Sequence, residues 1–273
     1  MEFRTPVDID RPPFLIEPLE ELLFVGSSFA DSISQRFAEE RFPVVANPYG
    51  VMYNPASVLH TIRRYADELP VDQQMPRIVI ITLGTNHVYR LKQTGEIVDN
   101  CQKRPQHLFN EEVLSTEECF DLLSEATDCV LHHRPDAHVV VTVSPIRYAK
   151  YGFHQSQLAK ATLLMAADKL VGHCSAATYF PAYEIILDEL RDYRFYQPDM
   201  LHPSQQAVEF IWQRFADVYL SPLAKQFLKD WKPIKEALHH KPFHPDSTDY
   251  QSFLAKTKES EEKLLARYNI YNV

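Results

Sequence analysis

Near its N-terminus the chain reads Leu22-Leu23-Phe24-Val25-Gly26-Ser27-Ser28-Phe29-Ala30-Asp31. The apolar residues before Gly26 are typical of a buried strand, and the residues after Ser28 have helical periodicity to about residue 40. A strand that passes into a helix through a glycine and two hydroxyl residues is typical of the ligand-binding edge of a doubly wound α/β sheet. Two interpretations of Ser28 fit this pattern, a helix N-cap and a nucleophile, and they are compatible.

The same alternation of strand and helix recurs along the chain. Further apolar or β-branched runs predict strands at about 44–46, 77–83, 138–143 and 176–180, and helices are expected at about 55–66, 117–133, 155–171, 181–192 and 203–229, the last bent or interrupted near Pro222. Residues 90–112 show no clear period and predict an irregular insertion near the loop edge of the sheet. The alternation predicts a parallel sheet covered by helices on both faces, which is a three-layer α/β/α sandwich.

The composition changes after Trp231. Residues 232–245 are rich in Lys, His and Pro, and residues 248–268 are charged with helical character. We therefore expect one α/β domain at 1–230, followed at 231–273 by a linker and a C-terminal helical appendage with little share in the core. We interpret His239, His240 and His244 as part of a solvated linker rather than as ligands of an adventitious metal ion.

The bulk composition excludes several classes of function. With 273 residues and a formal net charge of −9, the chain lacks the dense basic stripe that binds nucleic acid or an anionic membrane. No apolar run is long enough to cross a bilayer, and residues 1–6 do not resemble a secretory signal, so a soluble cytoplasmic protein is expected. The four cysteines form no C-x-x-C pair, which predicts free thiols and neither a disulfide frame nor a structural metal.

A second informative segment lies far along the chain, at Pro198-Asp199-Met200-Leu201-His202-Pro203. If Ser28 is a nucleophile, His202 is placed to remove its proton and Asp199 to orient the imidazole. Pro203 is expected at the first helical position, which would leave His202 at the helix cap. The structural alternative is a solvated His202 at the cap and an Asp199 that only caps a turn.

Acyl transfer also needs hydrogen-bond donors for the developing oxyanion. The candidates are the Ser28 amide at the helix start, the Gly50 amide and the carboxamide of Asn86. Each follows a predicted strand, so the parallel sheet would bring them to one edge. The alternative for Asn86 is local closure of the turn after the strand.

Three further residues are candidates for substrate binding. Arg147 ends a predicted strand at the same edge, where a guanidinium can bind a carboxylate or phosphate in bidentate fashion. A surface salt bridge is the equally weighted alternative for this arginine. Thr85 and His87 flank Asn86 and are candidates for lining the pocket, with a structural role as the alternative for His87.

The order of these segments resembles a known pattern. Gly26-Ser27-Ser28, Gly50, Gly84-Thr85-Asn86 and Asp199-x-x-His202 look like the four sequence blocks of the SGNH (GDSL-like) hydrolase superfamily. More closely, the chain resembles the GSCFA family, which is itself similar to SGNH hydrolases. This resemblance rests on the segments Gly26-Ser27-Ser28-Phe29-Ala30, Asn47-Pro48-Tyr49-Gly50-Val51, Thr82-Leu83-Gly84-Thr85, Ser144-Pro145-Ile146-Arg147, Tyr179-Phe180-Pro181-Ala182-Tyr183-Glu184 and Asp199-Met200-x-His202-Pro203-Ser204.

The resemblance implies a flavodoxin-like SGNH sheet and a serine esterase that cleaves a small acyl group, such as acetyl, from a polar carrier such as a carbohydrate. It implies no metal and no organic cofactor. The same residues would serve an acyltransferase, and the alternative from another class is a binding or scaffold protein on an inactive SGNH-like fold. In two places the chain departs from the pattern: Ser27 stands where an Asp is usual in the superfamily, and Ser28 stands where GSCFA proteins have the Cys of their name.

Overall fold

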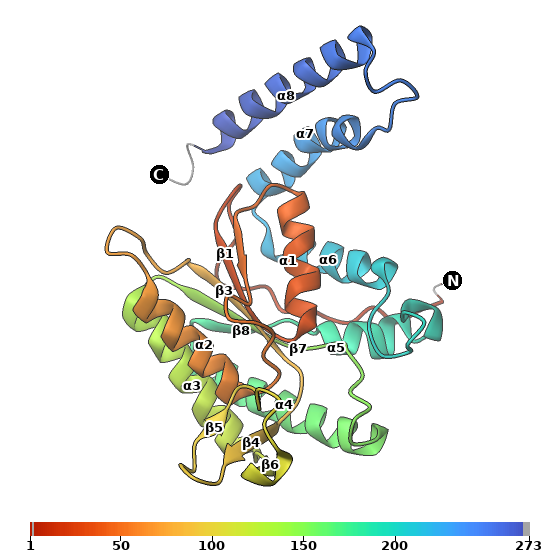
Figure 1. The fold of residues 1–273 in the computed structure, drawn as a ribbon. Coiled ribbons are helices and arrows are strands. Elements are labelled where there is room, and N and C mark those ends of the chain that lie inside the picture. The colour runs from red at the N-terminus through yellow and green to blue at the C-terminus, as the bar shows by residue number, and fades with distance from the viewer. Residues whose placement is uncertain (2, 270–273) are drawn as a thin grey trace.

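The computed structural model describes residues 1 and 3–269 and contains the predicted parallel sheet (Figure 1). All neighbouring strands of this sheet run parallel, in the order β2-β1-β3-β7-β8. This 2-1-3-4-5 arrangement is the flavodoxin-like order. The strands are β1 (Leu22–Gly26), β2 (Val44–Ala46), β3 (Ile78–Leu83), β7 (His138–Val143) and β8 (Ala177–Tyr179).

Alternate residues of the central strands enter two separate hydrophobic cores. Leu22 and Phe24 of β1 belong to one buried cluster, and Leu23 and Val25 belong to the other. Successive strand side chains point to opposite faces, so a strand without polar residues must be covered on both sides. This explains why β1 is apolar throughout and not alternating.

The two cores are covered by different helices, which gives the predicted three layers (Figure 1). One face carries α2 (Pro55–Glu68), α3 (Thr116–His133) and α4 (Phe153–His173). The other carries α1 (Ser28–Glu39), α5 (Ala182–Glu184) and α6 (Gln205–Tyr219), with a π-helical segment at Ile185–Leu190. Because all five strands are parallel, their carboxyl ends and the loops that follow lie along one edge.

The segment 90–112 was predicted to be irregular, and that prediction is wrong in part, because three short strands include or flank its loops. It lies in a small antiparallel sheet of order β5-β4-β6, with β4 at His87–Leu91, β5 at Ile97–Val98 and β6 at Phe109–Val113. The β6 sequence Phe-Asn-Glu-Glu-Val has only Phe109 buried. A strand that buries so little has no hydrophobic period to reveal it.

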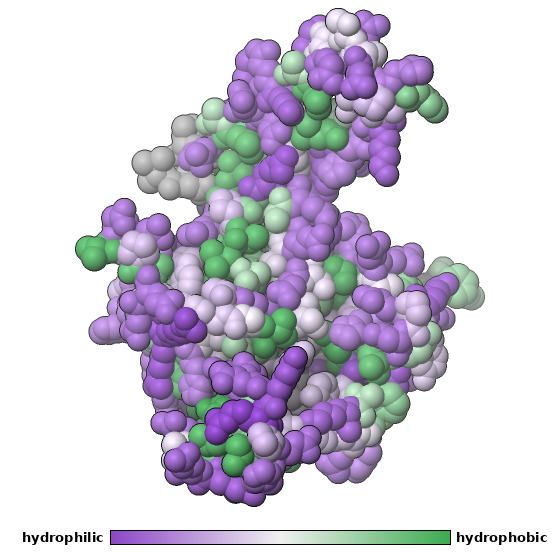
Figure 2. Space-filling model, viewed as in Figure 1, coloured by the Kyte–Doolittle hydropathy of each residue, from purple (hydrophilic) through white to green (hydrophobic). Residues whose placement is uncertain are grey.

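The predicted linker after Trp231 is also partly wrong, because α7 (Pro222–His239) continues through it, and α8 (Thr248–Asn269) then packs back on α7. Buried positions along α7 follow the helical spacing at Ala224, Phe227 and Trp231. Trp231, together with Leu264 of α8, is buried in the same core cluster as α1. The C-terminal helices project from the body as a lobe but share its core (Figure 2).

All four cysteines are free thiols, as predicted. Within residues 1 and 3–269, no helix combines the length and apolar character needed to cross a membrane.

The β1–α1 junction provides a test of the fold. Gly26 has φ +142°, and a Cβ built on it would lie 2.0 Å from the Thr82 carbonyl oxygen. We expect Gly26→Ala to lower the free energy of unfolding by about 2–6 kcal/mol, through backbone strain and overpacking. Gly172→Ala is the matched control, since nothing lies within 4 Å of a Cβ at this position in α4. The control should gain up to about 1 kcal/mol. Urea unfolding measures both, and equal effects would contradict this account.

Candidate active site

Asp199 and His202 form a hydrogen-bonded pair on an exposed turn. His202 Nδ1 lies 2.6 Å from Asp199 Oδ2, and Asp199 Oδ1 accepts the backbone N–H groups of His202 at 3.0 Å and Leu201 at 2.8 Å. These two backbone hydrogen bonds, and then the imidazole, lower the pKa of Asp199 to about 2. The carboxylate thus caps its own turn and also binds Nδ1 of the imidazole. Capping the turn and orienting the imidazole are the two roles considered from the sequence, and here one carboxylate makes both contacts. Nε2 of His202 has no hydrogen-bond partner among the described residues.

The prediction that His202 lies at the helix cap is wrong. The N-cap of α6 is Ser204, whose hydroxyl accepts the Ala207 N–H at 3.2 Å, and the helix begins at Gln205. Pro203 instead forms an antiparallel bridge with Tyr196, and its carbonyl accepts the Gln197 side-chain amide at 3.1 Å. The turn is therefore a short closed loop outside the helix, and serine caps the helix better than histidine does.

Arg147 ties this turn to the end of β7. Its Nη1 donates to the Met200 carbonyl at 2.8 Å, and its backbone N–H donates to the Leu201 carbonyl at 2.9 Å. The guanidinium lies 4.1 Å from the centre of the Phe153 ring, and the rings of Tyr193 and Tyr196 flank it. In the described part of the chain Arg147 forms no ion pair, so the salt-bridge alternative is wrong.

A buried lysine, Lys160, binds the start of the loop that carries Arg147. Lys160 of α4 is 2% exposed, and its Nζ donates to the Ser144 carbonyl at 2.8 Å. Burial lowers the pKa of Lys160 to about 7. Sequence analysis missed this residue because a lysine within an amphipathic helix is ordinarily solvated.

Ser28 lies in the first turn of α1, with its hydroxyl and its backbone N–H uncommitted within residues 1 and 3–269. The capping role belongs to its neighbour Ser27, whose Oγ accepts the Phe29 N–H at 3.3 Å. Ser27 Oγ also lies 3.0 Å from Thr82 Oγ1, and this hydrogen bond holds the Ser27 side chain against β3. Ser28 is therefore left free at a helix N-terminus, where the helix dipole favours negative charge. No hydrogen bond joins Ser28 to His202 in the described residues.

The other two oxyanion candidates are engaged within the protein. The Gly50 N–H donates to the Asn47 carbonyl at 2.8 Å. Asn86 is 2% exposed, and its Nδ2 donates to the Leu114 carbonyl at 2.7 Å. The Leu114 N–H donates to the Asn86 carbonyl at 2.9 Å, which extends the β4–β6 ladder by one residue. In this conformation neither group contacts Ser28 by a hydrogen bond.

Thr85 and His87 are likewise held by local contacts. Thr85 Oγ1 accepts the His87 N–H at 3.3 Å, and its side chain is buried. The His87 ring stacks on Tyr151 at 3.9 Å between centroids, and burial lowers its pKa. Both residues lie at the loop edge, as expected for residues that follow β3.

Asn47 organises the site more than its sequence position indicated. Its Oδ1 accepts the Gly26 N–H at 2.8 Å, and its Nδ2 donates to Asp31 Oδ1 at 2.8 Å. It adopts φ +41°, a conformation that asparagine tolerates better than most residues. From the sequence, Asn47 was named only as part of a segment that resembles the GSCFA pattern, and its place directly before Pro48 was the available signal of a turn.

Comparison with models of known families gives two matches. The model of the GSCFA family matches residues 21–76 and 71–215. The chain belongs to the GSCFA family. A second model, described as the C-terminal domain of GSCFA domain proteins, matches residues 231–273. The first match ends within α6 and the second begins at Trp231 within α7, and residues from both matches contribute to one core cluster.

Solved structures with a similar fold are distant. A member of the lipolytic G-D-S-L family from Veillonella parvula is 12% identical, with a TM-score of 0.49, over 73% of this chain and 98% of that one. A carbohydrate esterase of family 3 from Talaromyces cellulolyticus is 11% identical, with a TM-score of 0.44, over 77% and 99%. Comparison with curated protein sequences gives no match.

The buried Lys160 makes a pH-dependent prediction. Its pKa in the folded protein, about 7, is below its ordinary value of 10.5, so the unfolded chain binds more protons between these values. The folded state is therefore penalised below pH 7, and the penalty disappears as the pH rises toward 10. Wild type should gain a few kcal/mol relative to Lys160→Met between pH 6 and pH 9. Urea unfolding at both pH values measures this, with Lys229→Met, at an exposed position of α7, as the control, and a pH-independent difference would contradict it.

Proposed function

We propose that this protein is an ester hydrolase of the SGNH type that releases a small acyl group from a polar carrier. Ser28 is the nucleophile, His202 the general base and then the general acid, and Asp199 the residue that orients the imidazole. The proposal rests chiefly on the Asp199–His202 pair, because its geometry leaves Nε2 as the exposed nitrogen that would take a proton.

A second observation supports the proposal, because residues next to Ser28 and next to His202 line the same groove. Ser32, one turn after Ser28 on α1, lines the same groove as Gln197 and Pro203, which flank the turn that carries His202. Residues four apart share a helix face, so Ser28 lies at the end of the wall that faces the turn. The hydroxyl and imidazole would come within hydrogen-bond distance by side-chain rotation or when the substrate binds.

The proposed reaction has two steps. The Ser28 oxygen attacks the ester carbonyl while its proton passes to His202 Nε2, and His202 then protonates the departing alcohol as the C–O bond breaks. Water attacks the acyl-enzyme, His202 takes the proton of this water, and the Ser28 hydroxyl recovers a proton as the acid leaves. The Ser28 amide is the uncommitted oxyanion donor, and attack by an alcohol in place of water would make the same site an acyltransferase.

A non-catalytic binding protein is the competing proposal. It is favoured by the absence of a Ser28–His202 hydrogen bond among the described residues and by the engagement of Gly50 and Asn86. On this account the loop edge would recognise a ligand and leave it unchanged. The two proposals differ in whether Ser28 reacts.

Covalent labelling distinguishes them. A fluorophosphonate should label wild type, and Ser28→Ala should abolish the labelling and reduce hydrolysis of p-nitrophenyl acetate by about 10⁴- to 10⁶-fold. Ser34→Ala is the matched control, since Ser34 lies on the buried side of α1 and should leave both signals intact. No labelling and no hydrolysis by wild type would overturn the proposal.

Substitution of the orienting carboxylate is a separate test. Asp199→Asn retains the size of the side chain but removes the charge that holds the imidazole tautomer, so kcat should fall by roughly 10²- to 10⁴-fold. Asp192→Asn is the control, because Asp192 is likewise exposed and caps a short turn, by accepting the Arg194 N–H at 2.8 Å. Equal kcat values for the two variants would exclude a role for Asp199 in the reaction.

A further inference from the structure

A polar groove runs from the Asp199–His202 turn along the outside of α1. It has a volume of about 700 Å³ and lies between α1 and the start of α6, with one residue from α7 at its far end. We call it the α1–α6 groove. Its α1 wall is formed by Ser32, Gln35, Arg36 and Glu39, and its other wall includes Gln197, Pro203, Gln205, Gln206 and Glu209.

The residues of the α1 wall lie on the same helix face as Ser28, the proposed nucleophile. Ser28, Ser32, Gln35 and Glu39 are spaced at i, i+4, i+7 and i+11, which places them on one helix face. At 1.5 Å per residue this stripe is about 16 Å long. A substrate whose ester lies at Ser28 can therefore extend its carrier along the groove.

Carboxamides dominate the part of the groove nearest the turn. Gln35, Gln205 and Gln206 all face it, and among the described residues none of their side chains forms a hydrogen bond. Each carboxamide offers two donors and an acceptor, which matches the mixed donor and acceptor character of alcohol groups. Three uncommitted carboxamides on one groove fit a ligand with many hydroxyl groups.

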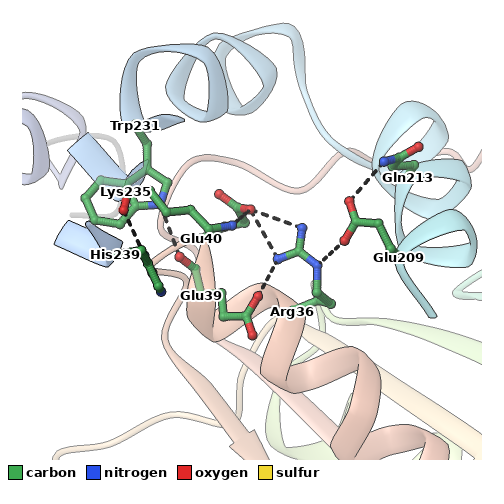
Figure 3. Close-up of polar contacts among 8 residues, drawn as sticks. All are labelled: Arg36, Glu39, Glu40, Glu209, Gln213, Trp231, Lys235 and His239. Atoms are coloured by element: carbon green, nitrogen blue, oxygen red, sulfur yellow. Dashed lines mark hydrogen bonds and ion pairs between the residues drawn. The ribbon is translucent and has the colours of Figure 1, made fainter. Parts of the chain in front are cut away.

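The far end of the groove is charged but internally neutralised (Figure 3). Arg36 contacts Glu39 at 3.0 Å, Glu40 at 3.2 Å and Glu209 at 2.5 Å, and Lys235 of α7 contacts Glu40 at 2.6 Å. Two cations thus face three carboxylates, so no surplus positive charge is left for an anionic ligand. Arg36 also stacks on Trp212 at 4.3 Å, which fixes the guanidinium in place.

We propose that the α1–α6 groove binds the carrier side of the substrate, and that this carrier is a neutral oligosaccharide. The inference rests on the proposed hydrolase function and extends it by naming the carrier and its site. The C-terminal module takes part, because Lys235 closes the groove and holds the charged cluster together.

The test compares a short and a long substrate. The double variant Gln35→Leu, Gln206→Leu removes two hydrogen-bonding groups at similar size. Its kcat/KM for an acetylated xylotetraose should fall roughly 5- to 150-fold, mainly through KM, since each hydrogen bond contributes modestly to binding. Its kcat/KM for p-nitrophenyl acetate, which does not reach the groove, should be unchanged. Equal losses on both substrates, or no loss on the acetylated sugar, would overturn the inference.

Gln74→Leu is the matched control, because this exposed glutamine lies before β3, at the opposite edge of the sheet. It should leave both substrates unaffected. Since all three glutamines are exposed, the melting temperatures should agree within about 2 °C.

Binding without chemistry separates failure of the groove from failure of the hydrolase. In calorimetric titration, Ser28→Ala should bind unmodified xylotetraose, and adding the two leucine substitutions should weaken binding by a similar 5- to 150-fold. This measurement decides the groove even if wild type neither labels nor hydrolyses esters. Absence of binding, or tighter binding of the anionic tetragalacturonate than of the neutral sugar, would overturn the inference.

Discussion

The site depends on the backbone of Gly26, where three loops meet. The Gly26 N–H donates to Asn47 Oδ1 and its carbonyl accepts the Met52 N–H at 2.8 Å, while the next residue donates its N–H to the Thr82 carbonyl at 3.0 Å. The Thr82 carbonyl also leaves no space for a Cβ on Gly26. One glycine therefore fixes the β2 loop, the end of β3 and the direction in which α1 departs. The position of Ser28 follows from that direction, because it is the first residue of the helix.

A second constraint fixes the other half of the site. The side chains of Asp199 and His202 are each about two-fifths exposed, and an exposed polar contact alone contributes little to holding a geometry. The turn is held by hydrogen bonds that involve its backbone. Two backbone N–H groups donate to the Asp199 carboxylate, and Arg147 donates two hydrogen bonds to backbone carbonyls of the turn. Met200 adopts φ +57°, a conformation that must be held by its surroundings. The Asp199–His202 pair is thus held by the segment that follows β7, whereas Ser28, the proposed nucleophile, follows β1.

Much of the fold could be predicted because the buried strands are mostly apolar and end at turn signals, as β1 does at Gly26. The β4–β6 sheet could not, because its strands bury too little to show a period. The helical continuation past Trp231 was missed because Pro233 interrupts the pattern, although α7 accommodates it. At the site, the spacing of Asp199 and His202 was local and could be recognised. The contact of Arg147 with Met200 joins residues 53 apart, and no sequence pattern encodes it.

In the proposed reaction, the serine at position 28 makes a general base necessary. A cysteine, which the GSCFA family has at this position, is substantially more ionised near neutral pH and depends less on a partner base. An alcohol requires a general base held in one tautomer, so replacing a thiol with a hydroxyl increases the demand on His202 and Asp199. Both residues are present here, with Nε2 exposed and Nδ1 occupied. The carboxylate that caps the turn is the same one that holds the imidazole at 2.6 Å, so the proposed reaction would need no further residue to orient His202.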